Sequence, residues 1–177
     1  YVRDKDKGEG VMMSEFTYIK LERGEGIAKI LFNRPEKLNA LNPEMQNEIG
    51  EALKIADSDP EIRVIIMSGI GRAFIAGADI SIMAGQNSFQ YREYAKWYHE
   101  IRQQMLGSSK PIIGAVNGYA FGGGAVLAFS TDLIVAAQGA KFGQQEINVG
   151  HIKGASYLPR IVGRFRAAQI VMLGEAI

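Results

Sequence analysis

Hydrophobic and polar residues alternate in two stretches near the start of the chain. Residues 17–22 alternate weakly and residues 27–32 alternate again, with the turn sequence Arg-Gly-Glu-Gly between them. Two alternating runs joined by a short turn that contains glycine are typical of antiparallel strands. The pattern therefore predicts a β-hairpin, which we expect to end at Asn33-Arg34-Pro35.

Three longer stretches have the spacing of helices instead. Asn42 precedes Pro43, and these residue types favour the cap and the first position of a helix. Apolar residues then recur on one helical face as far as Asp57: Met45, Ile49, Ala52, Leu53 and Ala56. Residues 88–106 predict a long amphipathic helix and residues 165–173 a last one. An Asp at 79 would also cap a short helix over residues 80–84.

Continuous apolar runs at residues 64–67, 111–116 and 133–136 predict strands that are buried on both faces. Because strands and helices interleave, the fold class is expected to be α/β. The 177 residues suffice for one domain with a sizeable core. We expect a linker or tag over residues 1–14 and a single core over residues 15–177.

The composition of the chain limits the partners and the metal sites that we expect. Hydrophobic residues make up 47% of the chain and the net charge is +1, so neither a nucleic acid nor a membrane is expected as a partner. No apolar run is long enough to span a membrane, which makes a cytoplasmic protein the default expectation. Cysteine is absent, and His99 and His151 lie far apart in the sequence, so no metal site is expected.

The richest candidate chemistry lies within residues 110–146. An apolar strand-like run leads to three consecutive glycines, Gly122 to Gly124, and then to an apolar run with helical spacing. Glycines at a strand-to-helix junction let backbone N–H groups face a ligand, and a helix N-terminus adds partial positive charge. This arrangement suits a developing oxyanion, although close helix packing explains the triplet equally well. Glu146 is a candidate general base, but a lone carboxylate is more often a surface group.

Two further glycine patterns are weaker. Residues 69–74 resemble a dinucleotide fingerprint, but Phe74 replaces the third glycine, so a glycine turn is favoured. In Ala76-Gly77-Ala78-Asp79 the small residues would let a ligand approach the backbone, although a capped turn is the more frequent explanation. The chain has no G-x-S-x-G motif and no Walker A sequence.

Four motifs taken together resemble one family. They occur in the order NRPEKLNALN, GRAFIAGADI, KPIIGAVNGYAFGGG and KFGQQEINVG, and LPRIVG follows them. In this order they strongly resemble the enoyl-CoA hydratase/isomerase family, the crotonase superfamily, from about residue 15 onward. The resemblance implies a spiral of ββα units and an acyl-CoA thioester ligand, with no cofactor beyond the coenzyme A of the substrate. It also implies a homotrimer or hexamer, formed with C-terminal helices that we expect to be missing after Ile177.

The resemblance also implies roles for particular residues. The backbone N–H groups of Ala78 and Gly123 match the family's oxyanion hole, and Glu146 matches a catalytic glutamate. Positions that match contacts to the substrate or its coenzyme A are Lys37, Leu38, Ala76, Gly77, Asp79 and Gly122. Two departures stand out: Val126 occupies the position of the second acid of the hydratases, and residues 150–158 form a shorter segment than is usual.

With a single carboxylate, the simplest mechanism is isomerisation. Glu146 would remove a proton from C2 of a 3-enoyl-CoA and return it at C4, while the two N–H groups stabilise the dienolate. Two alternatives remain open. One is an enoyl-CoA hydratase, for which a fusion with a 3-hydroxyacyl-CoA dehydrogenase is conceivable. The other is a non-catalytic module that binds acyl-CoA or forms oligomers. The acyl chain length is not specified by the sequence.

Overall fold

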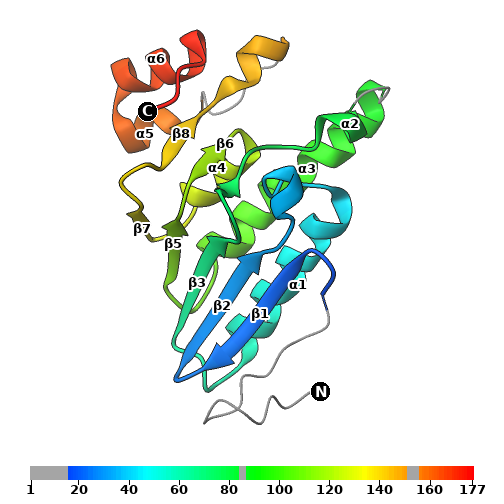
Figure 1. Cartoon of the computed structure of the whole chain (residues 1–177), viewed down its shortest axis with the longest axis vertical. Helices are drawn as coiled ribbons and strands as arrows, with labels where there is room; N and C mark the ends of the chain where they lie inside the picture. The colour runs from blue at the N-terminus through cyan, green and yellow to red at the C-terminus, as the bar shows by residue number, and fades with distance from the viewer. Residues whose placement is uncertain (1–15, 84–86, 151–155) are drawn as a thin grey trace.

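The structure is a computed structural model that describes residues 16–83, 87–150 and 156–177. The linker expected over residues 1–14 lies outside the described residues. Most of the shortened segment between Gly150 and Leu158 lies outside them too. Figure 1 shows the chain from end to end.

The hairpin predicted at the start of the chain is confirmed. Strands β1 (Ile19–Gly24) and β2 (Ile27–Phe32) pair in antiparallel register, from Ile19 opposite Phe32 to Gly24 opposite Ile27. The loop is only two residues long, and both Glu25 and Gly26 have positive φ angles, 53° and 79°. This backbone geometry matches the twist of the strands and is favoured in two-residue hairpins.

The hairpin opens a five-stranded sheet in the order β1-β2-β3-β5-β7. Strands β3 (Val64–Gly69), β5 (Ile112–Val116) and β7 (Leu133–Ala136) run parallel to β2 and to one another. Helix α1 (Pro43–Ser58) lies against β1 and β2 (Figure 1). Asn42 caps this helix as predicted, because its side chain accepts a hydrogen bond from Met45 N at 2.8 Å. All five apolar residues of the predicted face are buried.

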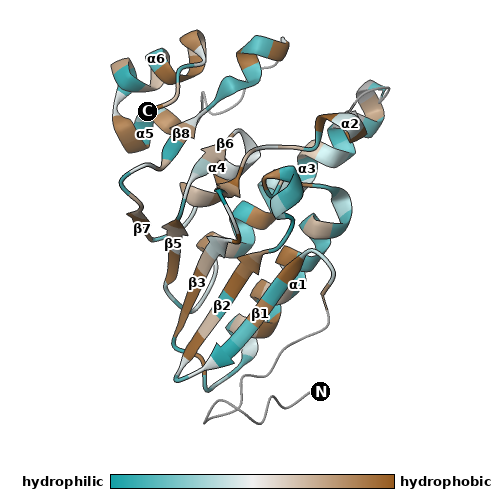
Figure 2. Cartoon of the chain, viewed as in Figure 1, coloured by the Kyte–Doolittle hydropathy of each residue, from teal (hydrophilic) through white to brown (hydrophobic). Residues whose placement is uncertain are grey.

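The predicted two-sided burial of the parallel strands is wrong in part. In β3, Ile65 and Met67 are fully buried, whereas Val64 and Ile66 are half-buried, so one face is covered more completely than the other. The whole of β7 is exposed, with Leu133 at 62% and Val135 at 65%. The reason is its position, because β7 is the edge strand and pairs only with β5. Figure 2 shows how apolar β3, β5 and β7 are along their length.

A second, three-stranded parallel sheet was not predicted. It consists of β4 (Ala73–Ile75), β6 (Tyr119–Phe121) and β8 (Lys141–Gly143), in the order β4-β6-β8. Each of these strands follows a strand of the first sheet along the chain, β3, β5 and β7 respectively. The chain therefore repeats a strand-strand-helix unit, as the family resemblance implies.

Glycines allow the chain to pass closely between the two sheets. A β-carbon at Gly69 would lie 1.9 Å from the carbonyl oxygen of Ala73, and one at Gly118 would lie 2.0 Å from that of Arg72. Any side chain at either position would collide with the backbone. In the glycine turn, Gly69 is thus explained by the close approach of two strands, and Gly71 by its positive φ of 87°.

The remaining α-helices vary in length from four to nineteen residues. Helix α3 (Ser88–Leu106) has the predicted bounds, and Asn87 forms a capping box with Gln90. Short helices are α2 (Ile80–Met83), α4 (Gly123–Ala128) and α5 (Leu158–Val162), followed by α6 (Arg164–Leu173) near the described C-terminus. Two 3-10 helices, η1 (Pro35–Lys37) and η2 (Gln145–Val149), complete the fold. In the described part of the chain, no helix is long and apolar enough to cross a membrane.

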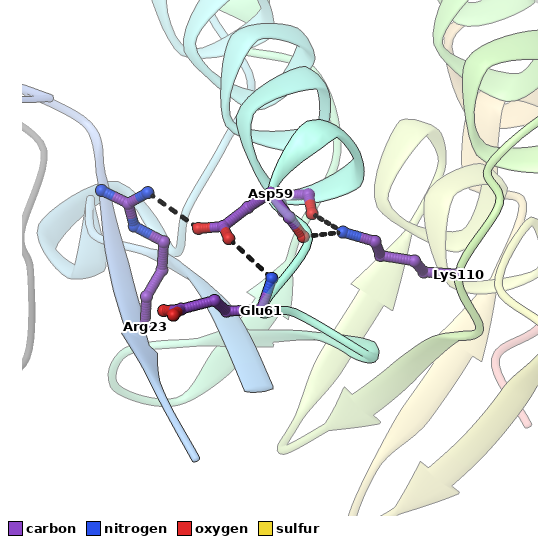
Figure 3. A network of polar contacts seen from close by, with 5 residues as sticks. Arg23, Asp59, Glu61 and Lys110 are labelled. Carbon is purple, nitrogen blue, oxygen red and sulfur yellow. Dashed lines mark hydrogen bonds and ion pairs between the residues drawn. The ribbon is translucent and has the colours of Figure 1, made fainter. Parts of the chain in front are cut away.

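A polar network joins the end of α1 to the first sheet (Figure 3). Lys110 Nζ donates to the carbonyl oxygens of Ala56, at 2.6 Å, and of Asp59. The Asp59 carboxylate pairs with Arg23 at 3.2 Å and accepts a hydrogen bond from Glu61 N at 3.0 Å. Lys110 therefore satisfies carbonyl groups that a helix C-terminus leaves without partners. Because Lys110 precedes β5, the network lies at the amino ends of the parallel strands.

Candidate active site

Three candidate residues follow the three strands of the small sheet. Ala78 comes after β4, Gly123 after β6 and Glu146 after β8. Since these strands are parallel, their carboxyl ends meet at one edge of the sheet, which is where α/β folds usually bind ligands. The order β4-β6-β8 places the glycine triplet between the other two loops.

In the loop after β4, the Ala78 N–H points away from Leu41, the residue that pairs with Gly77 and Asp79 on either side of it. Leu41 N donates to Gly77 O at 2.8 Å, and Asp79 N donates to Leu41 O at 2.9 Å. Successive N–H groups of an extended chain point to opposite sides, so the Ala78 N–H faces the side opposite Leu41. Among the described residues, no acceptor for this N–H is found. The loop lies beside β6, because a β-carbon at Gly77 would be 3.6 Å from Phe121 O.

The glycine triplet is required by the packing around it. A β-carbon at Gly124 would lie 2.0 Å from Ile75 O, and one at Gly123 would lie 2.4 Å from the Tyr98 hydroxyl oxygen. Close packing therefore accounts for these two glycines by itself. Gly123 is also the first residue of α4, and the N–H of a first helical residue has no acceptor within the helix. Packing and ligand binding are compatible explanations for this position.

Glu146 lies against the same loop. It is half-buried in η2, and a β-carbon at Gly122 would lie 3.1 Å from Glu146 Oε1. Gly122 has a φ of 51° and donates from its N–H to Gly143 O at 2.9 Å, which fixes the loop beneath the carboxylate. The carboxylate thus faces the glycine triplet rather than open solvent alone.

A buried amide orients this carboxylate. With its nitrogen toward Glu146, the Gln144 side chain donates to both carboxylate oxygens, at 3.1 and 3.2 Å. Its oxygen then accepts a hydrogen bond from the Tyr157 hydroxyl at 2.9 Å. In the reverse orientation the nitrogen donates to Gly122 O at 3.3 Å and to the Tyr157 hydroxyl at 2.9 Å, but the amide oxygen then lies against the carboxylate. We assign the first orientation because it avoids this contact between an acceptor and a charged acceptor.

Tyr157 connects this group to α3. The guanidinium of Arg102 lies over its ring, 5.5 Å from the ring centre. Burial raises the pKa of Tyr157 far above its ordinary value, the charge of Glu146 raises it further, and Arg102 acts in the opposite direction. The hydroxyl is consequently protonated throughout the physiological range and is available as a donor.

The positions matched to coenzyme A contacts come together only in part. Ala76 N donates to Leu38 O at 3.0 Å, so the loops that carry Lys37-Leu38 and Ala76-Gly77 lie side by side. Asp79 differs, because it is buried and its carboxylate pairs with Arg34 at 2.8 Å. The Ser81 hydroxyl donates to the same carboxylate at 2.6 Å, and this bond and then Arg34 lower the pKa of Asp79 against the effect of burial. Roles for all these residues in ligand binding stay predictions.

Val126 occupies the position expected for a second acid. It lies one turn into α4, is only 6% exposed, and donates from its N–H to Gly122 O at 3.0 Å. An aliphatic side chain there neither exchanges a proton nor orients water. Glu146 is therefore the carboxylate that the structure places beside the glycine triplet.

Sequence reasoning did not single out Gln144, Tyr157 or Arg102. A signal for Gln144 exists, because it precedes Glu146 by two positions and directly precedes the 3-10 helix that carries this carboxylate. No local pattern indicates Tyr157 or Arg102, which reach the site from distant parts of the chain.

Comparisons with known proteins identify the family of the chain. The profile of the family described as Enoyl-CoA hydratase/isomerase matches residues 22–177. A crotonyl-CoA hydratase of Syntrophomonas wolfei is 37% identical over 163 residues, which cover 90% of this chain and 63% of the relative. The mitochondrial enoyl-CoA hydratase of Pongo abelii is 40% identical over 173 residues, covering 93% of this chain and 58% of the relative.

The fold of the chain also matches solved structures. The crystal structure of enoyl-CoA hydratase from Thermoplasma volcanium matches with a TM-score of 0.86 at 35% identity, over 90% of this chain and 65% of that one. The chain thus spans less than two thirds of the length of each of these relatives. The ordered motifs, the repeated ββα units and these matches lead to one conclusion: the chain belongs to the enoyl-CoA hydratase/isomerase family and has the crotonase fold.

Proposed function

We propose that the edge of the small sheet binds an acyl-CoA thioester and stabilises its enolate, and that the reaction is hydration of a 2-enoyl-CoA. The observation that carries this proposal is the convergence of Ala78, Gly123 and Glu146 on the loops that follow three neighbouring parallel strands. The backbone N–H groups of Ala78 and Gly123 would donate to the thioester oxygen. Donors fixed where negative charge develops stabilise the transition state more than the ground state.

In the proposed hydration, Glu146 acts as both base and acid. It removes a proton from water as the hydroxyl oxygen bonds to C3, and the electron pair of the double bond moves onto the thioester oxygen. The enolate then collapses, and protonated Glu146 returns the proton to C2. Every proton is accounted for, and the carboxylate is regenerated.

Two observations point to different reactions. The relatives at 37–40% identity are named hydratases, which favours hydration. Val126 favours isomerisation instead, since one carboxylate is enough to move a proton from C2 to C4 of a 3-enoyl-CoA. We retain isomerisation as the second candidate and rank hydration first because of the relatives.

Two assays separate these reactions. Hydration is measured as the loss of the absorbance of the conjugated enoyl thioester in crotonyl-CoA. Isomerisation is measured as the appearance of this conjugated absorbance when a 3-enoyl-CoA is the substrate. The proposal predicts hydration as the faster reaction, whereas a faster double-bond shift would support the second candidate. Absence of both reactions, with thioester binding retained in calorimetry, would leave a binding module. Assembly as a trimer or hexamer stays a prediction, which sedimentation of the protein tests.

A further inference from the structure

We propose that Tyr157 is a positioning residue for Glu146, because its hydroxyl anchors the Gln144 amide, whose nitrogen faces the carboxylate. The inference deepens the proposed function, since it rests on Glu146 being the base. It concerns a side chain that sequence motifs do not indicate and that acts on the carboxylate only through Gln144.

The geometry of the amide carries the argument. Gln144 is 1% exposed, so water does not readily replace its partners. We assign the amide with its nitrogen toward Glu146, which places the nitrogen 3.1 and 3.2 Å from the two carboxylate oxygens and the oxygen 2.9 Å from the Tyr157 hydroxyl. The opposite orientation would let the nitrogen donate to Gly122 O at 3.3 Å but would leave the amide oxygen against the carboxylate. The carboxylate only accepts hydrogen bonds, so Glu146 sets which end of the amide faces it, and the Tyr157 hydroxyl holds the other end in place. Loss of the hydroxyl leaves that end without this partner and the amide less constrained.

The surroundings of Tyr157 keep its hydroxyl in place as a donor. Its ring is partly buried between the core and the Arg102 guanidinium, which contacts the ring face. The charged or titratable groups found to act on this hydroxyl are Glu146 from η2 and Arg102 from α3, among the described residues. Because the hydroxyl stays protonated, it serves as a donor to the amide oxygen at every pH at which the enzyme would work.

The arrangement has two consequences for a base. The bidentate amide contact fixes the direction of the carboxylate, which determines whether its oxygen reaches the proton to be moved. Hydrogen bonds donated to a carboxylate also favour its charged form. Removal of the Tyr157 hydroxyl should therefore slow the chemical step and let Glu146 take up a proton at higher pH.

The test compares Tyr157→Phe with Tyr18→Phe as a matched control. Tyr18 also has an arginine over its ring, Arg34 at 5.7 Å, but it directly precedes β1. In Tyr157→Phe, kcat should fall roughly tenfold to a hundredfold with little change in KM, the scale expected for a misplaced catalytic group. The acid limb of its pH–rate profile should move to higher pH, and the control should match the parent protein.

A second readout does not depend on turnover. The carboxyl carbon of Glu146, followed by carbon-13 NMR during a pH titration without substrate, reports its protonation midpoint. We expect a higher midpoint in Tyr157→Phe and no shift in Tyr18→Phe. If Tyr157→Phe does not fold, Gln144→Met tests the same network and should shift the midpoint in the same direction.

The outcomes separate this inference from the proposed function. An unchanged midpoint in a folded Tyr157→Phe protein overturns the positioning role, whatever the activity. A shifted midpoint in a protein that neither hydrates nor isomerises enoyl thioesters supports the network and overturns the proposed reaction instead. A shift of equal size in Tyr18→Phe would mean that general destabilisation is the cause, which also overturns the inference.

Discussion

Glu146 Oε1 lies 3.1 Å from the point that a β-carbon at Gly122 would occupy. Gly122 also has a backbone conformation, φ 51° and ψ −118°, that is essentially restricted to glycine. The contact joins the end of β6 to the end of β8, and it makes the carboxylate and the glycine loop a single unit. Changes to either partner should therefore affect both stability and activity.

Gly122→Ala tests this contact. The methyl group would displace the carboxylate and strain the backbone, so we expect a loss of stability of about 1–3 kcal/mol together with a fall in kcat. Chemical denaturation measures the first and initial rates measure the second. Gly139→Ala is a suitable control, because a β-carbon there has no atom within 4 Å. Equal effects of the two substitutions would contradict the contact.

Val126→Glu tests the absence of a second acid. A carboxylate at this position of α4 would be available to orient and activate water beside Glu146, so hydration of crotonyl-CoA should accelerate relative to isomerisation. Val126→Gln is the control, since it adds a polar side chain of similar size without a charge. If the Glu variant hydrates no faster than the Gln variant, the position does not face the reacting water.

Asp79 gives the stability of the protein a defined dependence on pH. Its pKa in the folded protein is lowered, mainly by the Ser81 hydroxyl and then by Arg34. A carboxylate of this kind stabilises the fold above its ordinary pKa of about 3.9, and the contribution is lost as pH falls through the lower folded value.

Asp79→Asn should accordingly be destabilised at pH 7, and its deficit against the parent protein should shrink as the pH falls below about 4. Urea denaturation at a series of pH values measures the difference. A deficit that is constant from pH 7 to pH 3 would show that the ion pair with Arg34 does not contribute through its charge.

Lys110 is predicted to matter for stability and not for chemistry. Its ammonium group donates to Ala56 O and Asp59 O at the end of α1, and loss of such charged hydrogen bonds costs about 1.5–3 kcal/mol. Lys110→Met keeps most of the side-chain volume and should lower the thermal midpoint. The kcat of the folded variant should equal that of the parent, because Lys110 precedes β5 and so lies at the amino end of that strand, opposite the end that leads to the candidate site. A reduced kcat would contradict this separation.

Elements with strong local signals could be predicted from the sequence. The hairpin has a two-residue turn, α1 has an Asn-Pro start, and α3 has a sustained amphipathic pattern, and all three are confirmed. The strands β4, β6 and β8 have only three residues each, which is too short for a period to appear. They exist because they pair with one another across long stretches of sequence.

The candidate site could also be predicted from the sequence only in part. Ordered motifs identified Ala78, Gly123 and Glu146, and the topology brings their loops to one edge of a sheet. Tyr157 and Arg102 could not be found in this way, because their contact exists only after α3 and the segment before α5 have packed together. The exposure of β7 was missed for a related reason, since an apolar run does not reveal whether its strand is central or at an edge.

Turnover by Glu146→Gln is the most direct test of the central claim that this carboxylate moves the proton beside an enolate held by Ala78 and Gly123. The amide keeps the size of the side chain but cannot act as a base, and general bases typically contribute about 10²–10⁴ to the rate. We predict a loss of kcat of that size with binding of a saturated acyl-CoA unchanged in calorimetry. Turnover at the parent rate in this variant would contradict the account.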